Sequence, residues 1–284
     1  TPIALGPQMS VPQNIGCPLS CEGGGRSEVR SRVAETARLL RIDHLLDRSV
    51  SGLAGGDRQR VALGRAIVRR PKAFLMDEPL GTLDTEFRDL MCQELRQLHN
   101  RIGATTVYVT HDQLEAMAMA DKIAVMNHGV IEQYGQPQEI YDRPKTMYVA
   151  DFIGSPSMNF LPFRGALHRG ERSIRLNGSD IAVPELREDS PGSALVLGVR
   201  PEHIILDDIS SLRGEILDAE YMGTTQIVTI TTEHGSVKAR IAADRVARTG
   251  EIVGLNFTAD RLSLFDSDSG RAIRTEFLEG DRNG

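Results

Sequence analysis

The stretch Phe-Leu-Met-Asp-Glu-Pro, residues 74–79, decides the fold predicted for this chain. Its apolar part is typical of a short strand buried in a parallel sheet, and two adjacent carboxylates follow it directly. Ligands of open α/β sheets bind at the carboxyl ends of the strands, so Asp77 and Glu78 are expected at a binding edge. Asp77 is placed to hold Mg²⁺, usually through water, and Glu78 to orient or deprotonate a water that attacks a phosphate. Taken alone, the stretch also fits a solvated loop after a buried strand.

The segments around this stretch alternate between helical and strand-like patterns. Helices are predicted over residues 27–41, 56–69, 84–101 and 114–120, and strands over residues 73–76, 105–110 and 123–126. Residues 1–26 are rich in Gly, Pro and Ser and are predicted to form a loop. The alternation of strands and helices predicts a layered α/β domain with a mainly parallel sheet.

The pattern changes near residue 155, where closely spaced strands replace the helices. These strands are predicted over residues 194–199, 214–219, 226–231, 237–241 and 252–257. Such spacing indicates a small all-β barrel or paired barrels. We therefore predict an α/β domain over residues 1–154, a β domain over residues 155–278 and a polar tail over residues 279–284.

The composition narrows the classes of partner. The chain has 284 residues, with 33 Lys and Arg against 39 Asp and Glu, and the net charge of −6 disfavours nucleic acid as a partner. The absence of Trp disfavours stacking platforms for single strands. Three cysteines, Cys17, Cys21 and Cys92, are too few and too sparse for a disulfide framework and fit a reducing compartment. No signal peptide is visible, and no uncharged run approaches the roughly 20 residues of a membrane span.

Two further segments carry candidate binding residues. Gly55 and Gly56 open the helix predicted over residues 56–69, so bare backbone N–H groups and the positive end of the helix dipole face an anion there. The alternative is a helix start without a ligand.

His111 lies at the end of the strand predicted over residues 105–110, where it can donate to a γ-phosphate. A single histidine at a strand end is also often structural.

The order and spacing of these motifs resemble those of the ATP-binding-cassette (ABC) ATPases. Residues 53–65 look like the signature motif of that family, residues 74–78 like its Walker B strand with the catalytic glutamate, and residues 82–84 like its D-loop. His111 looks like the switch histidine. The resemblance implies ATP and Mg²⁺ as cofactors, with Glu78 and His111 catalytic and Asp77 on the metal. It also implies that the nucleotide contacts Leu53, Ala54, Gly55, Gly56, Asp57 and Asp84.

The resemblance extends to the ATPase subunits of carbohydrate and glycerol-phosphate importers. It is carried by residues 108–113, 120–123 and 152–161, and by residues 198–203, which are similar to a signature of the barrels appended to those subunits. It implies an incomplete ABC nucleotide-binding domain of the P-loop NTPase kind, followed by an OB-like (TOBE-type) barrel. It also implies a homodimer with a second ATPase subunit, a transmembrane permease and an extracellular solute-binding protein. The expected location is the cytoplasmic face of a bacterial-type plasma membrane.

The chain departs from the family in the phosphate-binding loop. A P-loop, G-x-x-x-x-G-K-[ST], needs a Gly-Lys pair, and the sequence contains none. Residues 5–16 resemble the stretch that follows the family's Q-loop, whose glutamine would fall at Thr1. We therefore expect the Walker A portion to be missing and the chain to be inactive alone. The strand at residues 73–76 would then expose an unpaired apolar edge, which makes an isolated 1–154 segment prone to aggregate.

Three substitutions also separate the chain from the family's usual pattern. Ala54 stands where Ser is usual, which removes a hydrogen bond to the γ-phosphate worth about 1.5–3 kcal/mol. Asp57 stands where Gln is usual and adds a negative charge, and Gly81 stands where Ser is usual. Two functions remain open: an ATP-hydrolysing importer subunit, or a non-catalytic partner or regulatory module that lends Gly55 and Gly56 to an intact subunit.

Overall fold

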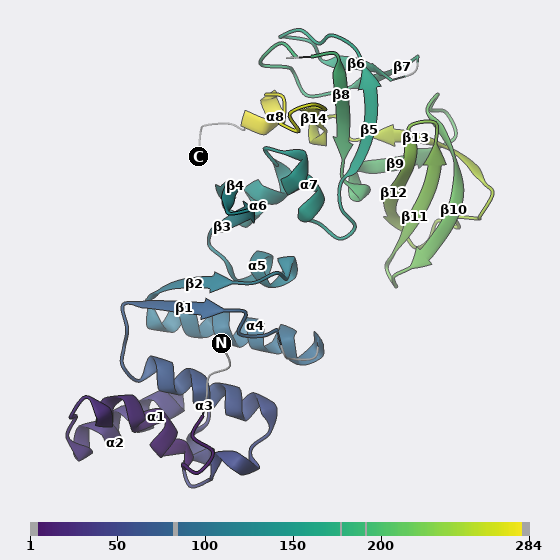
Figure 1. Ribbon diagram of the computed structural model, residues 1–284. Helices are drawn as coiled ribbons and strands as arrows, with labels where there is room; N and C mark the ends of the chain where they lie inside the picture. The colour runs from purple at the N-terminus through teal and green to yellow at the C-terminus, as the bar shows by residue number, and fades with distance from the viewer. Residues whose placement is uncertain (1–4, 82–84, 177, 191, 280–284) are drawn as a thin grey trace. The chain divides into compact units, whose positions relative to one another are not determined.

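The computed structural model describes residues 5–81, 85–176, 178–190 and 192–279, and of residues 85–87 the backbone alone. The chain divides into two compact units, Thr1–Met119 (unit 1) and Ala120–Gly284 (unit 2), which are described separately (Figure 1). The boundary predicted between an α/β domain and a β domain at residue 154 stays a prediction.

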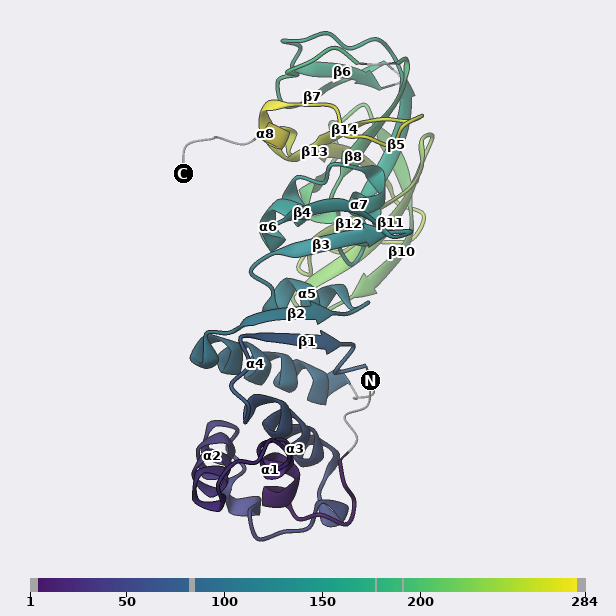
Figure 2. The ribbon, with the colours of Figure 1, turned by 60° about the vertical axis from the view of Figure 1, so that its left-hand side comes forward.

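Unit 1 consists of a helical layer and a short parallel sheet. The helical layer comprises α1 (Val11–Cys21), α2 (Arg26–Leu39) and α3 (Gly55–Ile67), with short 3₁₀ helices η1 (Asp43–Leu45) and η2 (Val50–Gly52) between α2 and α3. The sheet pairs β1 (Ala73–Asp77) with β2 (Thr105–Val109), and α4 (Thr85–Ile102) connects these two strands. Helix α4 lies against one face of the pair in both ribbon views (Figures 1 and 2). Helix α5 (Gln113–Met119) follows β2.

The loop predicted over residues 1–26 is wrong, because Val11–Cys21 forms helix α1. Ser10 caps this helix: its hydroxyl accepts from the N–H of Gln13, whose side chain accepts from the N–H of Ser10 at 2.8 Å. This reciprocal pair stabilises a helix start even in a segment rich in Gly and Pro. Val11 and Ile15 are fully buried in the core of the helical layer.

The parallel strand pair is covered on one face. Phe74 of β1 is buried in the core that it shares with the helical layer, whereas the neighbouring Leu75 is 82% exposed. Val107 and Val109 of β2 share the outer face with Leu75 and are about half exposed. We call these three residues the outer apolar face. The sequence predicted a strand buried in a larger sheet, but the described residues leave one face of the pair open.

The strand predicted over residues 123–126 does not extend this sheet, which corrects the expectation of a third parallel strand. It is β3 (Ile123–Asn127), and it pairs antiparallel with β4 (Val130–Gly135) in unit 2. His128 and Gly129 between them have φ angles of 45° and 82°. Two consecutive residues with positive φ form the tight turn that matches the twist of a β-hairpin, and that turn determines the pairing.

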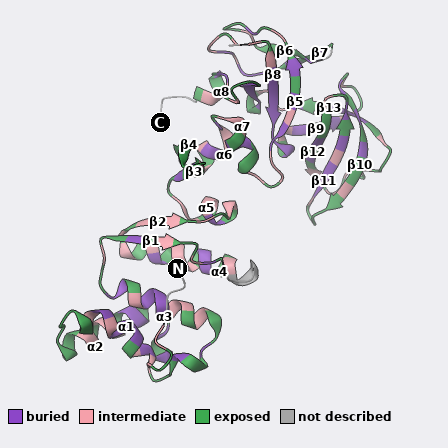
Figure 3. Ribbon diagram, in the orientation of Figure 1, coloured by how far each residue is buried: buried purple, intermediate pink, exposed green. Residues whose placement is uncertain are grey.

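Unit 2 contains antiparallel sheets around a large apolar core, with a smaller apolar cluster beside it. A five-stranded sheet has the order β12-β11-β10-β13-β9 and a three-stranded sheet the order β14-β8-β5. The core residues come from both sheets and from the β6–β7 hairpin, and Figure 3 shows this buried interior. The strands are β5 (Asn159–Arg164), β6 (Ser173–Leu176), β7 (Ser179–Ala182), β8 (Ala194–Val199), β9 (Ile204–Asp207), β10 (Arg213–Tyr221), β11 (Thr225–Thr232), β12 (Gly235–Ala242), β13 (Ile252–Phe257) and β14 (Ser263–Asp266). The helices are α6 (Pro137–Asp142), α7 (Met147–Phe152) and α8 (Glu276–Glu279), with 3₁₀ helices η3 (Pro201–His203) and η4 (Ala259–Arg261).

A buried arginine joins the helices of unit 2 to its strands. Arg200, which follows β8, is 2% exposed, and its guanidinium lies 4.2 Å from the ring centroid of Tyr141. It donates to the carbonyls of Tyr141 at 2.8 Å and Ala150 at 3.0 Å, and also to that of Ile153. Burial lowers the pKa of Arg200 from its ordinary value. These contacts satisfy the carboxyl end of α7, which otherwise leaves its last carbonyls unpaired.

Candidate functional site

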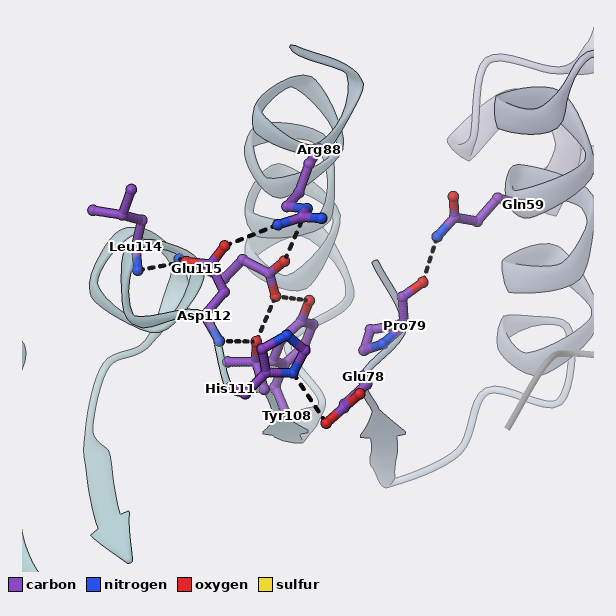
Figure 4. Close-up of polar contacts among 10 residues, drawn as sticks. Gln59, Glu78, Pro79, Arg88, Tyr108, His111, Asp112, Leu114 and Glu115 are labelled. Atoms are coloured by element: carbon purple, nitrogen blue, oxygen red, sulfur yellow. Dashed lines mark hydrogen bonds and ion pairs between the residues drawn. The ribbon is translucent and has the colours of Figure 1, made fainter. Parts of the chain in front are cut away.

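The two residues predicted as catalytic lie in contact at the carboxyl ends of β1 and β2. The N–H of Glu78 donates to the carbonyl of Val109 at 2.9 Å, which holds the end of β1 beside the end of β2. Oε1 of Glu78 lies 3.1 Å from Nδ1 of His111, as Figure 4 shows. Both side chains are more than half exposed, so the pair faces solvent at the edge where parallel sheets bind ligands.

Glu78 has an uncommon backbone conformation. Its φ of 43° lies in the left-handed region, which costs a residue with a side chain about 1–2 kcal/mol. The N–H of Gly81 donates to the carbonyl of Glu78 at 3.3 Å and closes the turn that contains it. Strained conformations of this kind persist where surrounding bonds enforce them, and they concentrate at functional sites.

Asp77 is the last residue of β1 and is exposed beside Glu78. The described residues contain no group of three or more His, Cys, Asp or Glu side chains that could hold a metal ion by themselves. Mg²⁺ is usually bound by one or two carboxylates together with water and substrate phosphates rather than by an all-protein cage. A single exposed carboxylate at this edge therefore fits the Mg²⁺ role expected for Asp77.

A buried carboxylate supports the backbone on both sides of His111. Glu115 of α5 is 4% exposed, and its Oε2 accepts hydrogen bonds from the hydroxyls of Tyr108 and Thr110, each at 2.8 Å. The hydroxyl of Thr110 also accepts from the N–H of Asp112 at 2.9 Å. Glu115 is not among the residues predicted from the sequence. The Asp-x-x-Glu spacing of residues 112–115, typical of a helix start, was the available signal.

Asp112 caps helix α5 and links it to α4. Its Oδ1 accepts from the N–H groups of Leu114 at 2.8 Å and Glu115 at 3.3 Å, and its Oδ2 lies 3.0 Å from Nη1 of Arg88. Nε of Arg88 lies 3.6 Å from Oε1 of Glu115. Burial raises the pKa of Asp112, but the backbone hydrogen bonds and Arg88 outweigh it and hold that pKa below its ordinary value. We call Arg88, Thr110, Asp112 and Glu115 the support network.

Burial also sets the protonation of two groups beside this network. It raises the pKa of the Cys92 thiol to about 11, with further contributions from Glu115 and other carboxylates. Burial and the hydrogen bond to Glu115 raise the pKa of Tyr108 above its usual range. Tyr108 therefore stays protonated and keeps donating to Glu115 over the physiological pH range.

The second predicted binding segment lies at the start of α3. Ala54 is the N-cap and has no side-chain oxygen with which to cap the helix, so the first N–H groups lack a side-chain acceptor from it. Gly55 is exposed, and a Cβ at this position would meet no described atom within 4 Å. Asp57 is half buried, and its carboxylate lies 3.8 Å from Nη1 of Arg60. The side chain of Leu53 packs in the apolar core.

Gln59 connects this helix to the turn that holds Glu78. Its side-chain nitrogen donates to the carbonyl of Pro79 at 2.8 Å. The next residue, Arg60, makes two bonds to Glu94 of α4, at 2.8 and 3.0 Å. Gln59 is not among the residues predicted from the sequence. Asp84, predicted to contact the nucleotide from the D-loop, lies outside the described residues.

Sequence profiles of known families match three parts of the chain. The profile described as ABC transporter matches residues 3–81, the MalK OB fold domain matches residues 154–204, and the TOBE domain matches residues 197–265. In the described parts of the chain, no helix combines the length and the apolar composition that crossing a membrane requires.

Curated relatives match almost the whole chain. The sn-glycerol-3-phosphate import ATP-binding protein UgpC of Ruegeria sp. is 40% identical over 279 residues, which cover 95% of this chain and 76% of that protein. The trehalose import ATP-binding protein SugC of Mycobacterium tuberculosis is 40% identical over 303 residues, with 94% and 76% covered. An uncharacterised ABC transporter ATP-binding protein, y4oS of Sinorhizobium fredii, is 44% identical over 271 residues, with 95% and 72% covered.

Proposed function

The chain belongs to the family of ABC-transporter ATP-binding subunits that includes the sugar and glycerol-phosphate importers, and from that membership we propose that it couples ATP hydrolysis to permease movement in an importer for such solutes. The observation that carries the proposal is the contact between Glu78 and His111 at the carboxyl edge of the parallel pair. This edge is where the phosphates of a nucleotide are held in open α/β sheets.

Asp77, Glu78 and His111 have defined chemical roles in this proposal. Bound at Asp77, Mg²⁺ would neutralise part of the charge on the phosphates. Glu78 orients a water molecule and accepts its proton, and the imidazole of His111 donates a hydrogen bond to a γ-phosphate oxygen. Asp84 would contact the nucleotide from the D-loop. Leu53 and Ala54 lead into the turn before α3, and Asp57 lies in its first helical turn.

The start of α3 serves a nucleotide held by a second subunit. Its free N–H groups at Gly55 and Gly56 and the helix dipole favour a phosphate there. The 284 residues contain no Gly-Lys pair and hence no P-loop, so we propose that they do not turn over ATP alone. Turnover in this proposal needs a P-loop supplied from outside these 284 residues.

The assembly that follows has several partners. We propose a pair of ATPase subunits, attached to transmembrane permease subunits at the cytoplasmic face of the plasma membrane and supplied by an extracellular solute-binding protein. The names of the relatives, which are import ATP-binding proteins, support this assembly. The MalK OB match begins at residue 154, which supports a boundary near that residue. We propose an ATPase portion over residues 1–154, a regulatory β portion over residues 155–278 and a tail over residues 279–284.

Calorimetry with Mg-ATP on the 284-residue chain is the first test. We expect no binding up to millimolar nucleotide, because no P-loop is present to hold the phosphates. Micromolar binding to the chain alone would contradict this part of the proposal. It would show that the phosphates are held without a P-loop.

The second test mixes the chain with the intact Ruegeria relative and measures ATP turnover. We expect turnover per intact subunit to rise, and Gly55→Glu to abolish the rise, because it places a carboxylate where a phosphate should lie. Glu78→Gln in this chain should also lower the rise, because the proposal gives Glu78 a catalytic role.

The alternative function is that of a non-catalytic partner or regulatory module. Ala54 and Asp57, which remove a hydroxyl and add a charge at the start of α3, favour it. In that case Gly55→Glu still abolishes the rise, because Gly55 and Gly56 are lent to the intact subunit, but Glu78→Gln in this chain leaves the rise unchanged. Unchanged turnover on mixing would exclude the lending of Gly55 and Gly56 in either version.

A further inference from the structure

The hydrogen bond between Gln59 and Pro79 connects two segments with separate roles. Gln59 lies one helical turn after Gly55 on α3, and Pro79 directly follows Glu78. The carbonyl of Pro79 can only accept, so the side chain of Gln59 must present its NH₂ group to it. The orientation of this side chain is therefore determined by chemistry (Figure 4).

The other end of the same side chain is left without a bond. Oε1 of Gln59 is buried and has no hydrogen-bond partner among the described residues. An unpaired buried acceptor lowers stability, and an apolar side chain of the same size would avoid that cost. The presence of glutamine here is therefore better explained by the bond that it donates than by its contribution to stability.

The backbone of the segment that receives this bond has little freedom to rotate. The ring of Pro79 fixes its own φ, and Leu80 after it is fully buried. Glu78 before it is held by Val109 through its N–H and by Gly81 through its carbonyl. A displacement of α3 that pulls on Pro79 is therefore transmitted to the backbone of Glu78, whose carboxylate contacts His111.

We propose that Gln59 is a positioning residue that couples the start of α3 to the Glu78–His111 pair. The proposal rests on the proposed function for the ligands at the two ends: a triphosphate held by a partner subunit at α3, and a reacting water at Glu78. Gln59 makes occupancy of one site change the geometry of the other within a single chain.

Three substitutions separate the donated bond from the packing of the side chain. Gln59→Met keeps the size without a donor, Gln59→Glu keeps acceptors only, and Gln59→Lys keeps a donor. The matched control is Gln93→Met on α4, because Gln93 is exposed. All variants are made in the full 284-residue chain.

The first readout needs no nucleotide. It measures the ring signals of His111 by NMR in protein with labelled histidine, together with hydrogen exchange at the Gly81 amide. We expect Gln59→Met and Gln59→Glu to shift the His111 signals and to speed exchange at Gly81 roughly fivefold to tenfold, as for the loss of one hydrogen bond. Gln59→Lys should restore both values, and Gln93→Met should change neither. Unaltered His111 signals in Gln59→Met would overturn the proposal.

The second readout adds the intact Ruegeria relative and Mg-ATP, with only this chain labelled. We expect Mg-ATP to shift the His111 signals of the parent chain and not those of Gln59→Met. Equal shifts in both would overturn the coupling. If the parent shows no shift, the ligand assignment in the proposed function fails, whereas the first readout still tests the contact itself.

Discussion

The hydroxyl of Thr110 donates to the carboxylate of Glu115 at 2.8 Å, and it accepts from the N–H of Asp112 at 2.9 Å. The hydroxyl of Thr110 therefore links the backbone on both sides of His111 to the buried carboxylate of Glu115. The imidazole itself is largely exposed, whereas the backbone that carries it is fixed from inside unit 1. The support network thus holds a solvent-facing side chain in a defined position.

Removal of Arg88 tests this support. Arg88→Met leaves the buried Glu115 and the cap Asp112 without their cation, and we expect unit 1 to lose about 2 kcal/mol of unfolding free energy. Urea unfolding monitored by circular dichroism measures the change. Arg101→Met, at the exposed end of the same helix, is the control and should cost less than about 0.5 kcal/mol. Equal costs for the two variants would contradict the structural role of Arg88.

The lowered pKa of Asp112 predicts a dependence of stability on pH. Its folded pKa lies below the ordinary 3.8, so its contribution is present above that value and is lost as pH falls through the folded pKa. We expect Asp112→Asn to destabilise the chain at pH 6 and to lose less stability than the parent between pH 4 and the acid limit. Parallel urea titrations at several pH values measure this. If the difference in unfolding free energy between parent and variant is the same at every pH, Asp112 is not the titrating group.

The cysteines are expected to differ in reactivity. With a pKa of about 11, the Cys92 thiol is only about 0.1% ionised at pH 8, and it is buried as well. Cys21 is exposed. A thiol reagent at pH 8 should label Cys21 within minutes and Cys92 only after unfolding, as peptide mass mapping will show. Rapid labelling of Cys92 in a Cys21→Ser chain would show that its environment opens in solution.

Two neighbouring residues of β1 provide a matched pair. Phe74→Ala removes a buried ring and should lower the unfolding free energy by about 3–5 kcal/mol. Leu75→Thr changes the outer apolar face and should lower it little. Leu75→Thr should also reduce binding of a hydrophobic dye and self-association, because exposed apolar strand surface promotes both. Light scattering and dye fluorescence measure these effects. A large loss of stability in Leu75→Thr would show that the outer face is covered in solution.

Arg200 is the corresponding test in unit 2. Arg200→Lys keeps the charge, but the lysine cannot reach three carbonyls and stack on Tyr141 at once. We therefore expect the unfolding free energy to fall by about 3 kcal/mol. The exposed Arg164 of β5, changed to Lys, is the control. Thermal unfolding of the two variants gives the comparison, and similar midpoints would refute the role of the buried guanidinium.

The sequence predicted the elements whose pattern is local. The strand at residues 73–77 and helix α4 followed from apolar runs and helical periods, and the family match shows the ABC and OB/TOBE fold class. Helix α1 differs from the predicted loop because the capping pattern of Ser10 and Gln13 starts a helix in a segment whose Gly, Pro and Ser content indicates a loop. The pairing of β3 with β4 was missed because it depends on a two-residue turn at His128 and Gly129.

The candidate site was predictable only in part. Asp77, Glu78 and His111 lie at or just after the ends of strands, so their motifs indicate where they lie. Glu115 and Gln59 act through side-chain contacts between different elements, and a single sequence does not show such contacts. Their roles required the geometry of α3, α4 and α5 around the strand ends.

The left-handed backbone of Glu78 has a consequence for directed evolution of this protein. Glycine adopts that conformation without strain, and asparagine tolerates it better than most residues, so either would relieve about 1 kcal/mol. A library screened for heat resistance alone should therefore enrich glycine or asparagine at position 78 and discard the carboxylate. Selection for stability would favour glycine or asparagine at position 78, whereas selection for ATP turnover would favour glutamate.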